Sequence, residues 1–119
     1  MIRRAFAAYE DGDMALLEGL FDPEARWLGV PSGGDTPECP DRSAIVDVLR
    51  RHRDHGRRFE LGDVIEEGDR VAVAVTVLNP EWSGPVQAYK VFTFRSGENV
   101  VVRMNDCIDE SYARQLLAA

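Results

Sequence analysis

The sequence predicts a single α+β domain spanning residues 1–119, with three helices first, a strongly curved and mainly antiparallel sheet next, and a short helix at the end. The hydrophobic period changes from 3.6 to 2 near Phe59, where helical spacing gives way to alternation. The 119 residues, 45% of them apolar, suffice for one core and are too few for two. Helices followed by hairpins favour a fold whose helices cover one face of the sheet.

Apolar residues at helical spacing predict the first two helices. Ile2, Phe6 and Tyr9 repeat at this spacing before Gly12-Asp13 breaks the segment. Asp13 is a suitable N-cap for the second helix, which ends at Asp22-Pro23. The apolar side chains of this second helix are Met14, Leu17, Leu20 and Phe21.

A short strand and a long loop precede the third helix. The strand is expected from Ala25 to Gly29, and the segment from Pro31 to Pro40 is too rich in proline, glycine and acidic residues for regular structure. Asp41 or Ser43 caps the helix, and Gly56 ends it. Its apolar stripe consists of Ile45, Val48 and Leu49 and continues to His52.

The second half of the chain is predicted to form β-hairpins. Phe59 to Glu66 is expected to pair with Arg70 to Leu78, and two more strands are expected from Val86 to Arg95 and from Val100 to Ile108. A final helix runs from its cap Asp109 to Leu117.

The turn between the last two strands decides which side chains share a face. A three-residue turn at Ser96-Gly97-Glu98 would put even-numbered residues of both strands on one face, whereas a two-residue turn would separate them. The first turn type predicts that Lys90 and Asp106 lie within ion-pair reach.

Composition argues against several classes of partner. The net charge of −7 disfavours nucleic acid, because phosphate binding needs a surplus of Lys and Arg. No stretch approaches the roughly 20 apolar residues of a membrane span, and the N-terminus lacks the pattern of a signal peptide, so we expect no membrane contact and a cytoplasmic protein. Five arginines near the end of the third helix are interpreted as a solvated face: Arg50, Arg51, Arg53, Arg57 and Arg58.

Neither the cysteines nor the histidines form a convincing metal site. Cys39 and Cys107 belong to no ligand cluster, so we expect free thiols and no structural zinc. His52 and His55 lie one helical step apart and could reach one ion, but no third ligand accompanies them. The sequence therefore predicts no metal and no cofactor.

A second copy of the chain is the expected protein partner. In the strand from Arg70 to Leu78, one face carries the small residues Ala72, Ala74 and Thr76. A monomer would leave this flat face exposed, which predicts a homodimer.

Four segments carry a resemblance to a known family: Phe6 to Asp13, Leu20 to Trp27, Arg42 to Ile45 and Val101 to Asp109. In order and spacing they resemble a SnoaL-like domain of the nuclear transport factor 2-like superfamily, which includes ketosteroid isomerase and polyketide cyclases. The resemblance covers nearly the whole chain and implies a cone-shaped fold around an apolar pocket. It implies no single reaction, because this fold hosts isomerases, cyclases, dehydratases, epoxide hydrolases and binding modules.

The resemblance also tests individual activities. Ketosteroid isomerase needs an Asp base and an oxyanion hole made of a Tyr and a protonated Asp, and the matching positions hold Ala5, Gly29 and Lys90. Limonene epoxide hydrolase needs an Arg-x-Asp step on a strand, which no predicted strand here contains. The SnoaL-like cyclases use a late Asp as general acid and base, and Asp106 resembles it in position. Their supporting His on a neighbouring strand is absent, since both histidines lie on the third helix.

If strand parity follows the resemblance, the cone holds three ionisable candidates. Asp106 would be the catalytic proton shuttle, with His52 as alternative base. Lys90 could hold an anionic group, stabilise an enolate or form a Schiff base; the structural alternative is a buried Lys90–Asp106 ion pair. The pocket is expected to be lined by Trp27, Val48, Val75, Tyr89 and Met104.

The sequence thus predicts a protein that binds a small apolar or weakly anionic molecule with a carbonyl group. One hypothesis is an acid-base enzyme of the cyclase, isomerase or dehydratase type, and the other is a non-catalytic ligand-binding or dimerisation module. A catalytic Asp106 must reach an open cavity, whereas a structural one should be paired and shielded. Trp82, in a loop bounded by prolines, is expected to cover the pocket mouth or a dimer partner.

Overall fold

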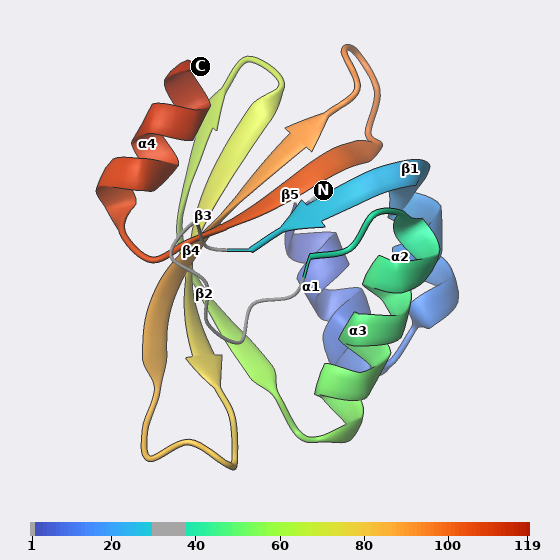
Figure 1. Cartoon of the computed structure of the whole chain (residues 1–119), viewed down its shortest axis with the longest axis vertical. Helices are drawn as coiled ribbons and strands as arrows, with labels where there is room; N and C mark the ends of the chain where they lie inside the picture. The colour runs from blue at the N-terminus through green and yellow to red at the C-terminus, as the bar shows by residue number, and fades with distance from the viewer. Residues whose placement is uncertain (1, 30–37) are drawn as a thin grey trace.

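The computed structural model describes residues 2–29 and 38–119, which form four helices and one five-stranded sheet (Figure 1). The strands follow the order β1-β5-β4-β3-β2; β1 runs parallel to β5, and the other neighbours are antiparallel. The α+β class and the mainly antiparallel sheet are confirmed. In chain order the elements are α1 (Ile2–Asp11), α2 (Met14–Leu20), β1 (Phe21–Leu28), α3 (Arg42–Asp54), β2 (Arg58–Glu67), β3 (Arg70–Leu78), β4 (Val86–Phe94), β5 (Val101–Cys107) and α4 (Glu110–Ala118).

Helix ends follow local rules. The side chains of Asp13, Asp41 and Asp109 each accept a hydrogen bond from the backbone N–H three residues later, at 3.1, 2.9 and 2.8 Å. The structure therefore selects Asp41 over Ser43 as the cap of α3. Gly56, just beyond that helix, has a φ of 85°, which glycine adopts at little cost.

The first strand begins earlier than expected. The backbone is already extended at Phe21, where the sequence predicted helix, and Phe21 pairs with Val101 of β5 before an irregularity that ends at Arg26. Helix α2 ends at Leu20, before the predicted stop at Asp22-Pro23, and these two residues lie within β1. Long-range pairing with β5 thus overrides the local stop signal.

Most of the predicted loop from Pro31 to Pro40 lies outside the described residues. Within the described part, Cys39 forms an isolated antiparallel bridge with Trp27, with N···O distances of 3.0 and 2.8 Å. Cys39 and Cys107 are both buried free thiols. Burial raises the pKa of Cys107 to about 12, so this thiol is unreactive at neutral pH.

The sheet carries helices on both faces (Figure 1). Helices α1 to α3 cover the concave face, and α4 packs on the convex face, where Ala113 and Leu117 cover Ala72. The expectation that the face of Ala72, Ala74 and Thr76 is exposed is therefore wrong for Ala72, which is 3% exposed. Ala74 and Thr76 remain partly exposed. None of the described helices is both long enough and apolar enough to cross a membrane.

Candidate functional site

Two charged side chains meet inside the cone. Lys90 on β4 lies directly opposite Asp106 on β5, with 2.6 Å between Lys90 Nζ and Asp106 Oδ1. Both residues are buried, with 7% and 8% of their surfaces exposed. The predicted ion pair is confirmed, but the three-residue turn from which it was predicted is wrong. Arg95 N–H donates to Val100 O at 2.9 Å, which leaves four residues in the turn, and a register shift between Thr93 and Phe94 is what aligns even-numbered residues of the two strands.

A third residue completes this cluster. Trp27 Nε1 donates a hydrogen bond to Asp106 Oδ2 at 2.9 Å, so each carboxylate oxygen has its own donor. The ammonium of Lys90 lies 4.7 Å from the centre of the Trp27 ring and 5.7 Å from that of Phe59, within cation–π range. A buried carboxylate with both oxygens engaged fits the structural reading of Asp106 better than that of a free base.

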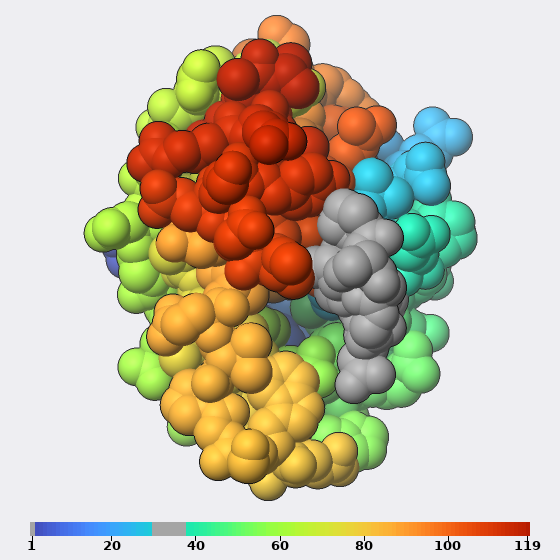
Figure 2. All heavy atoms as spheres, turned by 60° about the vertical axis from the view of Figure 1, so that its left-hand side comes forward, coloured from blue at the N-terminus to red at the C-terminus, as the bar shows by residue number. Residues whose placement is uncertain are grey.

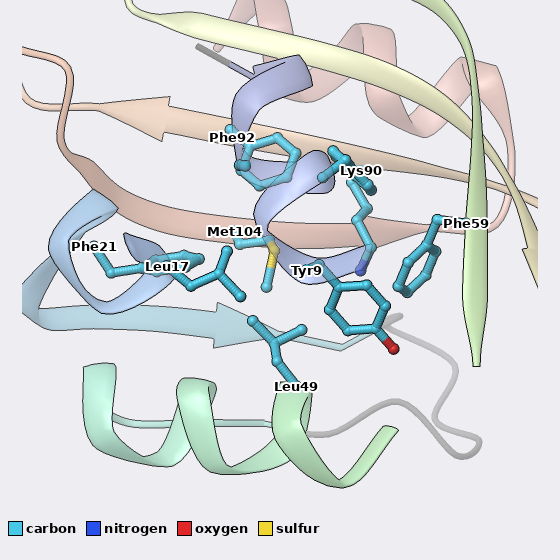
Figure 3. Close-up of a pocket in the computed structure, with 10 residues that line it drawn as sticks. Tyr9, Leu17, Phe21, Leu49, Phe59, Lys90, Phe92 and Met104 are labelled. Atoms are coloured by element: carbon cyan, nitrogen blue, oxygen red, sulfur yellow. The ribbon is translucent and has the colours of Figure 1, made fainter. Parts of the chain in front are cut away.

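An apolar cavity of about 40 Å³ lies beside Lys90, between the N-terminal helices and the sheet (Figure 3). One water molecule needs about 10–15 Å³ on this scale, so the cavity has room for about three. A ligand with a ring can enter only if the walls move, and flexible side chains such as Met104 make this feasible. The lining residues are Ala5, Phe6, Tyr9, Leu17, Phe21, Leu49, Phe59, Lys90, Phe92 and Met104, among which Lys90 carries the one formal charge.

The predicted pocket residues are only partly brought together. Met104 lines the cavity, while Trp27 and Val75 are buried in the same core and Val48 packs against that core. The placement of Tyr89 in the pocket is wrong, because its side chain lies on the convex face and donates to Glu110 at 3.4 Å. Neighbouring strand residues point to opposite faces, so Tyr89 must point away from the cone once Lys90 points into it.

The aromatic wall of the cavity was missed by the sequence reasoning. Phe92 shares its face of β4 with Lys90, and this parity was a signal that could have identified it. Phe6 contacts Phe92 and Phe59 edge to face, with ring centres 6.3 and 5.7 Å apart. Tyr9 also lines the cavity, and burial raises its pKa to about 12. The helical residues gave no comparable signal, because their stripe identifies them only as core.

His52 on α3 lies beyond Trp27, with the two ring centres 6.1 Å apart and the rings edge to face. Burial, followed by the positive charges of Arg57, Lys90 and Arg51, lowers the pKa of His52 to about 4. The imidazole is therefore neutral at physiological pH, and it is a weak base. Nη1 of Arg57 lies 3.3 Å from both of its ring nitrogens.

This pKa shift of His52 predicts a pH dependence of stability. Between about pH 6.5 and 4 the unfolded chain binds a proton at His52 that the folded chain does not, so the free energy of unfolding should fall as the pH falls through that window. Above this window His52 contributes no slope. Urea denaturation measured between about pH 6.5 and 4 should show that the unfolding free energy of His52→Gln depends less steeply on pH than that of the wild type. The difference in slope should be at most about 1.4 kcal/mol per pH unit. His55→Gln, at an exposed position on the same helix end, is the matched control; equal slopes in both variants would contradict the assignment.

His52, Arg57 and Trp82 form a group at the open side of the cone, which we call the mouth cluster. Trp82 is half-buried in the β3–β4 connection and packs against the core, and the Arg57 guanidinium carbon lies 5.0 Å from its ring centre. Figure 2 shows the surface hollowed between this connection and α3. Across residues 2–29 and 38–119, no group of three or more His, Cys, Asp or Glu side chains is arranged to hold a metal ion.

Comparison with known families agrees with this architecture. The family model described as the SnoaL-like domain matches residues 2–103. The chain belongs to the SnoaL-like domain family. A search among curated proteins finds no match.

Solved structures of SnoaL-like and related domains superpose over most of the chain. Protein SMa1630 of Sinorhizobium meliloti, described as a polyketide cyclase, is 18% identical with a TM-score of 0.75. The match covers 88% of this chain and 91% of that protein. TerC, crystallised with polyporic acid, is 21% identical with a TM-score of 0.70, covering 99% and 95%. An epoxide hydrolase of M. tuberculosis that resembles limonene epoxide hydrolase is 12% identical with a TM-score of 0.72, covering 98% and 86%. At these identities the similarity concerns the fold.

Proposed function

We propose that this SnoaL-like domain binds a small, mainly apolar molecule with a carbonyl group in the cone, and that Lys90 holds the carbonyl oxygen. The observation that carries the proposal is a buried ammonium at the wall of an otherwise apolar cavity. An ammonium has three N–H donors, and within the described residues Lys90 uses one of them, toward Asp106. Asp106 and Trp27 orient the lysine, and a ligand oxygen would take a remaining donor.

Butyrophenone and butylbenzene form a suitable probe pair, because they differ in shape mainly by one carbonyl oxygen. NMR titration should shift the Met104 methyl resonance, and butyrophenone should bind roughly tenfold or more tightly, the usual contribution of a hydrogen bond to a charged group. Equal affinities for the two probes would contradict the role of Lys90.

Removing Lys90 alone leaves a buried carboxylate, so the informative variant replaces the pair. Lys90→Met combined with Asp106→Leu substitutes apolar side chains for both charges, an exchange that buried pairs often tolerate. This variant should fold, bind butylbenzene as the wild type does, and lose its preference for butyrophenone. A retained preference would show that another group holds the oxygen.

Acid-base catalysis is the second candidate, because an ammonium beside an apolar cavity can stabilise an enolate. The available bases argue for binding alone: both oxygens of Asp106 are engaged, and the lowered pKa of His52 makes it a weak acceptor of protons. Deuterium exchange at the α-carbon of butyrophenone in D₂O separates the two candidates. If the wild type exchanges faster than buffer alone and Asp106→Asn does not, the protein is an enzyme that uses Asp106.

A homodimer through the part of the convex face that α4 leaves open remains our proposal for assembly. Ala74 and Thr76 are partly exposed there, and Tyr89 lies beside them on β4. Light scattering at micromolar concentration should give about twice the chain mass of 13.3 kDa. A mass near 13.3 kDa at every concentration would contradict the dimer. The cytoplasmic location and the absence of a nucleic-acid partner stay predictions.

A further inference from the structure

Arg57 in the mouth cluster has an incomplete set of partners. Within residues 2–29 and 38–119, no carboxylate lies in ion-pair reach of its guanidinium, and its buried Nε has no hydrogen-bond partner. Among the described residues, its Nη1 contacts the neutral imidazole of His52, and its guanidinium carbon lies 5.0 Å from the centre of the Trp82 ring. Buried N–H groups without a partner are rare in folded proteins, so this one calls for an acceptor.

The neighbouring arginines differ from Arg57 in this respect. Arg50 and Arg58 form ion pairs at 3.1 and 2.8 Å, and Arg53 donates to backbone carbonyl oxygens of α1 at 2.9 and 3.0 Å. These three fit the interpretation of a solvated helix end. Arg57 does not, because it is half-buried and packed against an aromatic ring.

Arg57 is bonded to the wall of the cavity that also carries Lys90. Tyr9, which lines the cavity close to the Lys90 ammonium (Figure 3), donates its hydroxyl to the backbone oxygen of Arg57 at 2.7 Å. Trp27 and His52 connect the Lys90 cluster to the Arg57 side chain through successive contacts. These contacts connect Arg57 to the wall of the cavity on the side of Lys90.

We propose that the ligand of the cone carries a carboxylate as well as a carbonyl, and that Arg57 binds this carboxylate at the mouth. The inference rests on the proposed function, since Arg57 can select a ligand only if the cone accepts one. A guanidinium matches a carboxylate in plane and in donor spacing, and the cation–π contact with Trp82 restricts where the guanidinium lies. The apolar body would lie in the cavity, the carbonyl at Lys90 and the carboxylate nearest to solvent.

Local charge agrees with an anionic group. Although the chain carries a net charge of −7, the groups that act on His52 are mainly cationic. Within the described part of the chain, the charges of Arg57, Lys90 and Arg51 lower its pKa, and that of Asp106 raises it. Such a local surplus of positive charge favours and steers an anion.

Benzoylpropanoate and benzoylpropanamide test the proposal, because they share the ring, the ketone and the chain and differ in charge. Isothermal titration of the wild-type protein should show the acid binding roughly 10- to 100-fold more tightly than the amide, as expected for a charge-assisted pair. In Arg57→Gln this preference should disappear while the affinity for the amide stays the same. Arg50→Gln, at an exposed position of the same helix and paired with Asp47, is the matched control and should keep the preference.

A second readout separates direct contact from general attraction. Bound carboxylate at Arg57 offsets the nearest positive charge, so the pKa of His52 measured by NMR should rise with the acid and stay unchanged with the amide. Equal affinities of the wild type for acid and amide would overturn the inference and leave the proposed function intact. If butyrophenone and both of these probes fail to bind, the proposed function fails and the inference fails with it.

Discussion

Asp106→Asn should lower the free energy of unfolding by about 3–5 kcal/mol, the usual cost of removing one member of a buried ion pair. The amide keeps the shape of the side chain, but the Lys90 ammonium, 7% exposed, loses its counter-charge. At several degrees per kcal/mol for domains near this size, the melting temperature should fall by more than about 10 °C. Thermal denaturation followed by circular dichroism measures this directly.

Two further variants make the result for Asp106→Asn specific. Glu24→Gln removes a carboxylate at an exposed position without an ion pair in the described structure, and it should change stability by less than about 0.5 kcal/mol. Lys90→Met with Asp106→Leu should recover part of the loss, because no buried charge remains, although the Trp27 Nε1–H loses its acceptor. A small change in melting temperature for Asp106→Asn, together with loss of turnover on a ketone, would instead favour the catalytic reading of Asp106.

Phe92→Ala should cost about 3–5 kcal/mol, since it removes a buried ring from the cavity wall. Phe92 is 4% exposed and contacts Phe6 edge to face, and the space that it leaves would join the existing cavity. A larger cavity forfeits more packing contacts, and the surrounding side chains recover only part of them. Equilibrium urea denaturation, with the slope held common to both proteins, gives the difference in stability.

Phe94→Ala is the matched control for this substitution. Phe94 lies two residues along the same strand on the same face, but it is only partly buried at the end of β4. Its loss should be roughly half as large, because the cost scales with the apolar area removed from the core. Equal losses for the two variants would mean that the site around Phe92 collapses into the space.

Local sequence was sufficient for most of the elements. The caps Asp13, Asp41 and Asp109 and the glycine after α3 act through bonds to residues three or four positions away, so they are visible in a short window. The start of β1 was missed because Phe21 pairs with Val101, eighty positions along the chain. Sequence periodicity reports which face is buried, and it does not report the partner strand.

The candidate site also has a part that local sequence predicted and a part that it did not. Strand alternation placed Lys90 and Asp106 correctly on the inner face, but the register that sets them opposite each other comes from the shift between Thr93 and Phe94, which the sequence did not reveal. The donor from Trp27 comes from the distant β1, and no sequence pattern linked it to Asp106. The aromatic rings that reduce the pocket to about 40 Å³ also come from different elements, and their packing follows from volume rather than from order in the chain.

The arginines near the end of α3 and the small residues of β3 show most clearly what the sequence alone could not predict. Five arginines near the end of α3 look alike in sequence, yet packing against Trp82 and His52 sets Arg57 apart from the others. Similarly, Ala72 belongs to a face that reads as exposed until α4 folds back over it. Strand alternation, helix capping and turns depend on residues that are close together in the sequence, so they can be predicted from it. Burial and ion pairing depend on which distant surfaces meet, and that is fixed when the layers pack together.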